Sequence, residues 1–143
     1  MSEQNTIFDP LRKKRVAATP EELVRQKMIE HLSEKCGWPK TLMLSEVEIS
    51  LSHMGESLQM PKFRCDIVCY NKQSEPQVIV ECKAPHVKIT TKTFEQIGRY
   101  CLILNTPWFI VTNGEKTYCA NWSQTENKYI FTNELPKYRG RER

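Results

Sequence analysis

Two apolar runs joined by a short polar turn constrain the fold of this chain more than any other feature of its sequence. Residues 63–70 and 77–83 are rich in apolar and β-branched side chains. This pattern predicts two buried strands with a turn between them. Three charged residues interrupt or end these runs, namely Asp66, Glu81 and Lys83. Since an isolated charge is costly in a buried strand, each of them requires a partner or a function.

Further elements are expected on both sides of these strands. A first helix is predicted to begin at Thr19 as the N-cap, with Pro20 in its first turn and Glu22 completing a capping box, and to end at Gly37. The other expected elements are a strand at 42–52 with a phase shift at Val47 that a β-bulge would explain, a loop at 53–61, a helix at 91–105, a strand at 108–111 and a hairpin-linked strand at 117–122.

The order of these elements, α-β-β-β-α-β-β, predicts an α/β fold with a mixed sheet flanked by helices. The first three strands are expected to form an antiparallel meander, and the second helix is expected to cross over to a parallel strand. We expect one domain at residues 19–132, because a chain of 143 residues suits a single core. A basic, weakly structured arm is expected at 1–18 and a basic tail at 133–143.

The composition permits several classes of partner. A net charge of +4 allows a polyanionic partner without requiring one. The basic residues near both termini could bind nucleic-acid phosphates or could simply be solvated, and the sequence leaves both interpretations open. Six cysteines form no C-x-x-C pair, so reduced thiols in a cytoplasmic protein are expected rather than a zinc site. No apolar run approaches the roughly 20 residues of a membrane span, and no secretory signal is expected.

Asp66, Glu81 and Lys83 have the chemistry of a site that hydrolyses phosphodiesters. Alternate residues of a strand point to the same face, so Glu81 and Lys83 share a face, and Asp66 can lie beside them if the strands are neighbours. Carboxylate oxygens bind Mg2+, a bound metal activates water, and a lysine can orient that water. The competing interpretation is a surface salt bridge, which is common and contributes little to stability.

The same three residues belong to an ordered set of motifs. Asp66 with Glu81-x-Lys83, flanked by apolar strands, resembles the core motif of the PD-(D/E)XK nuclease superfamily. Over roughly residues 19–122, the chain resembles the N-terminal nuclease domain of type I restriction enzyme R (HsdR) subunits. The motifs that carry this resemblance are TPEELVRQ at 19–26, RCDIV at 64–68, IVECKAP at 79–85, TFEQI at 93–97 and IVTNG at 110–114.

The resemblance implies a restriction-endonuclease-like core and a role for each residue of its motif. Asp66 and Glu81 would be metal ligands together with the backbone carbonyl of Cys82, and Lys83 would be the catalytic lysine. The metal would be Mg2+, with Mn2+ as a substitute. Cys65 stands where the motif's name has proline, a position that these enzymes vary widely.

Residues on the two helices are expected to complete the site. Many members add a glutamate from the first helix, and we expect Glu21 to fill this role, because its spacing to Val24 and Met28 places it on the core-facing side. The alternative is Glu22, which the capping box already explains. Other residues are expected to support the site or contact DNA, and their alternative is an ordinary solvated helix surface: Gln96, Tyr100, Lys88, Lys92 and Arg99.

These features predict an Mg2+-dependent DNA endonuclease that acts by direct attack of water on phosphorus. No G-x-x-x-x-G-K-[ST] loop is present, so no helicase motor is expected in this chain. The resemblance implies methylase, specificity or helicase subunits as partners, and a homodimer is expected if duplex DNA is cut. The alternatives are a non-catalytic DNA-binding or protein-docking module with the same fold, and a structural protein whose charges are surface pairs.

Overall fold

The computed structural model describes residues 5–50 and 62–140. The expected loop at 53–61 lies outside the described residues. Two α-helices and eight strands follow one another along the described parts of the chain: β1 (Thr6–Asp9), β2 (Lys14–Ala17), α1 (Pro20–Glu34), the short 3-10 helix η1 (Lys40–Leu42), β3 (Met43–Ser50), β4 (Lys62–Tyr70), β5 (Pro76–Cys82), α2 (Thr91–Leu104), β6 (Trp108–Thr112), β7 (Thr117–Ser123) and β8 (Lys128–Thr132).

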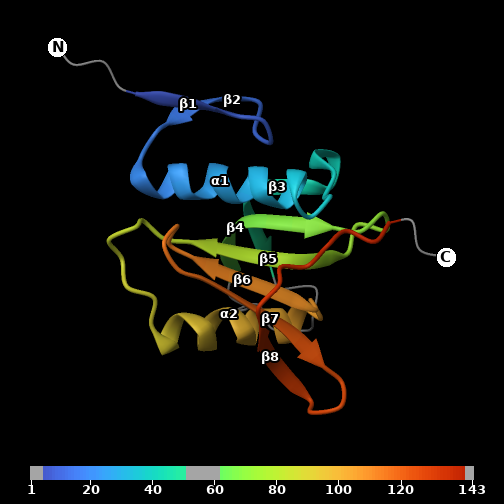
Figure 1. Ribbon diagram of the computed structural model, residues 1–143. Coiled ribbons are helices and arrows are strands. Elements are labelled where there is room, and N and C mark those ends of the chain that lie inside the picture. The colour runs from blue at the N-terminus through green and yellow to red at the C-terminus, as the bar shows by residue number, and fades with distance from the viewer. Residues whose placement is uncertain (1–4, 51–61, 141–143) are drawn as a thin grey trace.

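Six of the strands form one mixed sheet in the order β3-β4-β5-β6-β7-β8. All neighbouring pairs are antiparallel except β5 and β6, which are parallel and are joined through α2. Figure 1 shows α1 and α2 on opposite faces of this sheet. The predicted antiparallel meander, crossover helix and mixed sheet are therefore confirmed.

Each helix closes its own hydrophobic core against the sheet. On the α1 face, Ile29 and Leu32 pack with Ile67, Val80 and Ile110. On the α2 face, the buried side chains that pack together include Ile97, Cys101, Val68, Ile79 and Phe109. Because β5 contributes to both cores, its side chains are buried on both faces, which explains its uninterrupted apolar run.

The first helix begins at its predicted N-cap, but the Glu22 carboxylate, predicted to complete a capping box, accepts hydrogen bonds from Arg12 and Gln26. The Thr19 Oγ1 accepts a hydrogen bond of 3.1 Å from the Glu22 backbone N–H, and Pro20 occupies the first turn. The helix ends at Glu34, and Gly37 follows with a φ of 81°, a conformation that favours glycine.

The N-terminal segment is more ordered than its composition suggested. Residues 6–17, expected to be weakly structured, form the antiparallel hairpin β1–β2 next to α1 (Figure 1). Asp9 is fully buried, and its Oδ1 accepts a hydrogen bond of 2.8 Å from the backbone N–H of Leu11, which closes the turn. Besides Leu11, which packs on the α1-side core, buried polar contacts of Asp9 hold this hairpin, and hydrophobic periodicity does not reveal such contacts.

The C-terminal part of the chain also packs on the domain. Strand β8, absent from the predicted order, pairs with β7 from Cys119–Thr132 to Ser123–Lys128. Farther on, the Pro136 carbonyl accepts a hydrogen bond of 3.0 Å from the indole N–H of Trp38, whose ring contacts Tyr138. The described part of the expected tail is therefore attached to the core.

In β3 and β4, the regular alternation of side chains between the two faces of the sheet is interrupted, at Glu46 in one strand and at Asp66 in the other. Cys65 packs in the α2-side core, yet Ile67, two residues later, packs in the α1-side core. The register is the same on both sides of this point, so the predicted phase shift at Val47 involves no inserted residue and the β-bulge is wrong. Instead, Glu46 has a φ of 54°, which costs a non-glycine residue roughly 1–2 kcal/mol.

None of the helices in the described ranges is long and apolar enough to cross a membrane.

Candidate active site at the ends of β4 and β5

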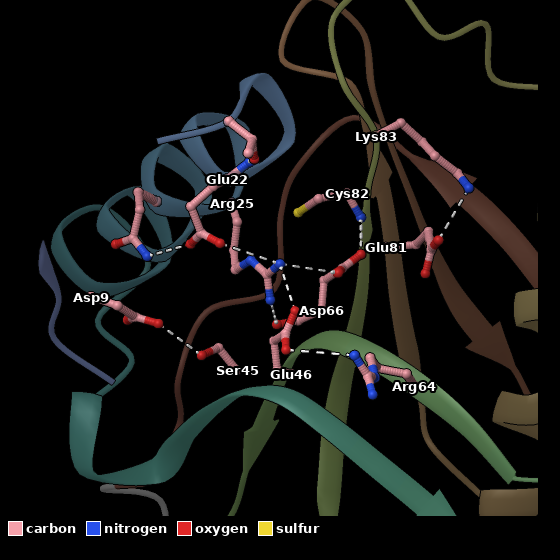
Figure 2. A network of polar contacts seen from close by, with 12 residues as sticks. Asp9, Glu22, Arg25, Ser45, Glu46, Arg64, Asp66, Glu81, Cys82 and Lys83 are labelled. Carbon is pink, nitrogen blue, oxygen red and sulfur yellow. Dashed lines mark hydrogen bonds and ion pairs between the residues drawn. The ribbon is translucent and has the colours of Figure 1, made fainter. Parts of the chain in front are cut away.

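Asp66 and Glu81 lie where β4 and β5 separate. The ladder between these strands ends at the pair Ile67–Val80. Directly beyond it, the Asp66 Oδ2 accepts a hydrogen bond of 2.7 Å from the backbone N–H of Cys82 (Figure 2). A carboxylate thus takes the place of a strand carbonyl as acceptor. This contact fixes Asp66 beside Glu81, the residue that precedes Cys82.

Glu81 and Lys83 lie together at the end of β5, as the strand period predicted. The Lys83 Nζ is 3.3 Å from the Glu81 Oε2, and both side chains are about one-third exposed (32% and 30%). The backbone N–H of Lys83 donates a hydrogen bond of 2.8 Å to the Thr112 carbonyl at the end of β6. The parallel neighbour therefore holds the backbone of the lysine while its side chain remains accessible.

A pocket of about 180 Å³ joins these two residues to α2. Gln96 and Tyr100, one helical turn apart, line it from the helix. Its remaining wall is formed by Arg64, Cys65, Ile79, Glu81, Lys83, Thr93 and Ile97. The structure thus brings together four of the predicted site residues. Asp66 is not part of this lining, and the opposite, α1 side of the sheet supplies its neighbours.

Burial opposes the ionisation of both carboxyl groups. The pKa of Asp66 is raised to about 7, chiefly by desolvation and also by the charge of Glu81, against the lowering effect of the Cys82 N–H. Desolvation also raises the pKa of Glu81, although Lys83 acts in the opposite direction. The charge of Glu81 therefore adds to the effect of burial on Asp66. A cation placed between them would favour the charged forms of both.

Arg25 contacts Asp66 from the α1 side. Its Nη1 donates to the Asp66 backbone carbonyl at 3.4 Å, and its Nη2 lies 3.7 Å from the Asp66 Oδ1. The same Nη2 is 3.2 Å from the Glu46 Oε2 and 3.4 Å from the Glu22 Oε1. Arg25 is buried and thus shares its charge among three carboxylates (Figure 2).

Glu46 connects three arginines from three different elements. Besides Arg25 of α1, its carboxylate lies 3.6 Å from Arg64 of β4 and 3.9 Å from Arg12 of the N-terminal hairpin. Arg12 in turn is 2.7 Å from the Glu22 Oε2 and forms an ion pair with Asp9. We call the set Asp9, Arg12, Glu22, Arg25, Glu46, Arg64 and Asp66 the arginine–carboxylate network.

Of the two glutamates in the first turn of α1, Glu22 rather than Glu21 faces the interior of the protein. Glu22 is buried, and its Oε2 accepts hydrogen bonds from Arg12 and from the Gln26 side chain at 2.9 Å. Glu21 is exposed, so the expectation that it shares the core-facing side is wrong. Its charge nevertheless contributes to the raised pKa of both Asp66 and Glu81.

The remaining predicted residues are two that line the pocket and three charged residues outside its lining. Gln96 is exposed and Tyr100 is half-buried, as befits residues at a pocket mouth. Lys88, Lys92 and Arg99 are exposed and do not line the pocket. Their side chains are accessible to a ligand, and the structure assigns them no contact with the carboxylates.

Arg25, Glu46, Arg64 and Arg12 were not identified from the sequence. One signal was present: Arg25 stands at helical spacing before Met28, Ile29 and Leu32, which are all buried. A charged residue on such an apolar stripe indicates a buried ion pair. Glu46 and Arg12 carry no comparable pattern, because their roles depend on the backbone at Glu46 and on the N-terminal hairpin.

Metal ligands are few on the side chains of the described ranges. No group of three or more His, Cys, Asp and Glu residues there is arranged to hold a metal ion. Asp66 and Glu81 provide two carboxylates, and a backbone carbonyl such as that of Cys82 is a further oxygen donor. Mg2+ usually keeps several waters and is often bound through only one or two carboxylates, so this donor set suits it.

Comparisons with known proteins give a consistent assignment. A solved fragment assigned to the HsdR subunit of a type I restriction enzyme from Vibrio vulnificus YJ016 has a similar fold, with a TM-score of 0.56 at 14% sequence identity. The alignment covers 82% of this chain and 23% of that one. No curated protein matches. Residues 20–136 match the family model described as the type I restriction enzyme R protein N terminus (HSDR_N). Because this match covers most of the chain, the chain belongs to that family.

Proposed function

We propose that this domain is a metal-dependent DNA endonuclease with a restriction-endonuclease-like, PD-(D/E)XK core. The observation that carries the proposal is the meeting of Asp66, Glu81 and Lys83 where β4 and β5 separate. The hydrogen bond from the Cys82 N–H to Asp66 and the ion pair between Lys83 and Glu81, the residue before Cys82, support this grouping. Two carboxyl groups whose ionisation is opposed by burial are suited to a divalent cation, and the neighbouring lysine is suited to a phosphate.

Asp66, Glu81 and the carbonyl of Cys82 would hold this cation, most naturally Mg2+ or Mn2+. When bound, it would supply an acidified water and offset the negative charge that develops on the phosphate. Lys83 would orient the attacking water and donate to a phosphate oxygen from the pocket wall. Gln96 and Tyr100, on the opposite wall, would position the substrate, and Glu21 would add a third acidic group at the edge of the site.

The proposed substrate and partners follow from family membership. The substrate would be DNA, which Lys88, Lys92 and Arg99 on the exposed surface near the pocket could contact through phosphates. The chain spans about a quarter of the length of the HsdR structure that it resembles. We propose that it acts with the methylase, specificity or helicase subunits of a type I restriction system. Cleavage of both strands by this domain alone would require two copies or two successive visits.

A non-catalytic module is the second candidate. The observation in its favour is that both oxygens of Asp66 already have protein partners, the Cys82 N–H and the Arg25 guanidinium. In this alternative, the arginine–carboxylate network only holds the elements together. The domain would then bind DNA or another subunit without turnover.

Nicking of supercoiled plasmid in Mg2+ or Mn2+ separates the two candidates. We expect activity in the wild type and its loss with EDTA. Lys83→Ala should reduce the rate by roughly 100-fold or more, because a positioned charge at the reacting phosphate is lost. Asp66→Asn should abolish activity while it keeps an oxygen that can accept the Cys82 hydrogen bond. Lys128→Ala, an exposed lysine of β8 with one weak ion pair, is the matched control and should retain full activity.

The same assay can contradict the proposal. Equal nicking by the wild type, Lys83→Ala and Asp66→Asn would show that the activity comes from another source. DNA binding without any metal-dependent nicking in the folded wild type would favour the non-catalytic module.

A further inference from the structure

Arg64 brings a second cation to the pocket of Glu81 and Lys83. It is part of the pocket lining, two residues before Asp66 on the same strand. Its side chain is 62% exposed, about twice the exposed fraction of Lys83. Glu81, Lys83 and Arg64 are the charged residues in this lining. Lys83 lies against Glu81, so the guanidinium of Arg64 is the more available cation for an incoming anion.

The arginine–carboxylate network holds this guanidinium in place. The Arg64 Nη1 lies 3.6 Å from the Glu46 Oε1, and Glu46 is itself bound through its Oε2 to the buried Arg25 at 3.2 Å (Figure 2). The backbone of Glu46 has a φ of 54° at this point, which is uncommon for a glutamate. An arginine held on one side and exposed on the other presents its remaining donors to the pocket without first losing conformational freedom.

A purely structural role explains these features poorly. An exposed ion pair contributes little to stability, so Arg64 has little structural value at this position. Arginine also matches a phosphate better than lysine does, because its planar group can donate two parallel hydrogen bonds. The arrangement therefore fits recognition of a phosphate that enters the pocket.

We propose that Arg64 binds a phosphate group of the DNA strand that enters the pocket formed by Glu81, Lys83 and Tyr100, and that Glu46 positions it. This proposal rests on the proposed nuclease function for the identity of the ligand. It does not rest on turnover, because a phosphate contact is also present in a complex that is not cleaved.

The experiment measures DNA affinity and cleavage for Arg64→Ala, Arg64→Lys and the control Lys128→Ala in the full chain. Affinity for a short labelled duplex is measured by fluorescence anisotropy in EDTA at several salt concentrations. Arg64→Ala should weaken binding about tenfold, as expected for the loss of one charged hydrogen-bond contact. The slope of log K against log salt should become shallower by about 0.9, which corresponds to one phosphate contact. Arg64→Lys should restore the slope but only part of the affinity.

Cleavage kinetics provide an independent readout. Arg64→Ala should raise KM by a similar factor while kcat changes less than KM does, because the contact is made to the bound substrate before reaction. The melting temperature should be unchanged, which separates loss of a contact from loss of the fold.

Each result supports or overturns the proposal. If the wild type binds and cleaves DNA and Arg64→Ala matches it in affinity, salt slope and KM, the assignment of Arg64 is wrong while the nuclease function stands. If the wild type binds DNA without cleaving it and Arg64→Ala still loses one phosphate contact, the assignment of Arg64 stands and the nuclease function fails. Absence of DNA binding by the wild type overturns both.

Discussion

At the scale of single residues, Asp66 should make stability depend on pH. Its pKa is about 7 in the folded protein against an ordinary value of 3.8, so the folded state keeps a proton that the unfolded state has lost between these values. Stability must therefore fall as the pH rises from about 4 to about 7. The total loss from this group is at most about 4 kcal/mol. We predict that the melting temperature of the wild type, relative to Asp66→Asn, decreases across this range in metal-free buffer.

Asparagine is the appropriate comparison, because it does not titrate and can still accept the Cys82 hydrogen bond. Glu126→Gln, which removes an exposed carboxylate near β8, should show no such trend. A constant difference between the wild type and Asp66→Asn from pH 4 to pH 8 would mean that Asp66 ionises normally in the folded protein.

The central residues of the candidate site could be predicted from the sequence because they break a pattern. Asp66, Glu81 and Lys83 stand in or next to apolar strands, where a charge is conspicuous. The choice between Glu21 and Glu22 could not be made in this way. One residue along a helix turns the side chain by about 100°, and the buried member of the pair was decided by Arg12, which comes from a hairpin that the sequence did not reveal.

At the scale of elements, the N-terminal hairpin should be part of the stable domain. Arg12 bonds to the fully buried Asp9 and to the buried Glu22, so its removal leaves two carboxylates without their main cation. Burial opposes the ionisation of Asp9, yet hydrogen bonds led by that from Arg12 hold its pKa below the ordinary value. We predict that Arg12→Ala destabilises the protein by about 3 kcal/mol, measured by urea unfolding at pH 7.

Arg15 offers a matched control on the same hairpin. It is exposed and its hydrogen bonds are confined to Thr6, so Arg15→Ala should change stability by less than about 0.5 kcal/mol. The double variant Asp9→Asn with Arg12→Ala should lose less stability than the two single variants lose in sum. Each single substitution already removes the same ion pair between Asp9 and Arg12. Equal and small effects of Arg12→Ala and Arg15→Ala would mean that the hairpin is a loosely attached arm.

The elements that could be predicted are those whose own residues indicate their burial or their ends. The centre of strand β5, Val78-Ile79-Val80, is buried on both faces and is apolar, and α1 carries Thr19 and Pro20 at its start. Strand β8 left a weaker signal in Tyr129 and Phe131, whose rings pack on Phe109. Strands β1 and β2 left none, since charged contacts with distant residues stabilise them.

At the scale of the whole molecule, the mixed sheet could be predicted because chain order limits its topology. A helix between two strands favours a parallel pair, and short turns favour antiparallel neighbours. The attachment of the C-terminal segment to Trp38 could not be predicted in this way. It depends on a hydrogen bond between residues 98 positions apart, and no local sequence pattern indicates a contact between them.

The six cysteines provide a measure of the stability of the entire domain and of its response to a cation. All six are buried and free, and they are distributed over the hydrophobic cores on the two faces of the sheet. Burial raises the pKa of Cys101 to about 12 and that of Cys119 to about 11, and it also raises the pKa of Cys36, Cys65, Cys69 and Cys82. Since the thiolate is the reactive form, labelling at pH 8 should require that the protein opens.

We therefore predict that a thiol reagent labels the native protein slowly, labels all six cysteines quickly in denaturant, and reports unfolding. A cation that binds only the folded state at ten times its Kd would reduce the open population, and with it the labelling rate, about 11-fold. Mg2+ should produce this protection in the wild type and lose most of it in Asp66→Asn, whereas Na+ at equal ionic strength should protect neither. Equal labelling with and without Mg2+ in the wild type would show that Asp66 and Glu81 do not bind the ion, and would leave Arg25 and Lys83 as their cationic partners within the described residues.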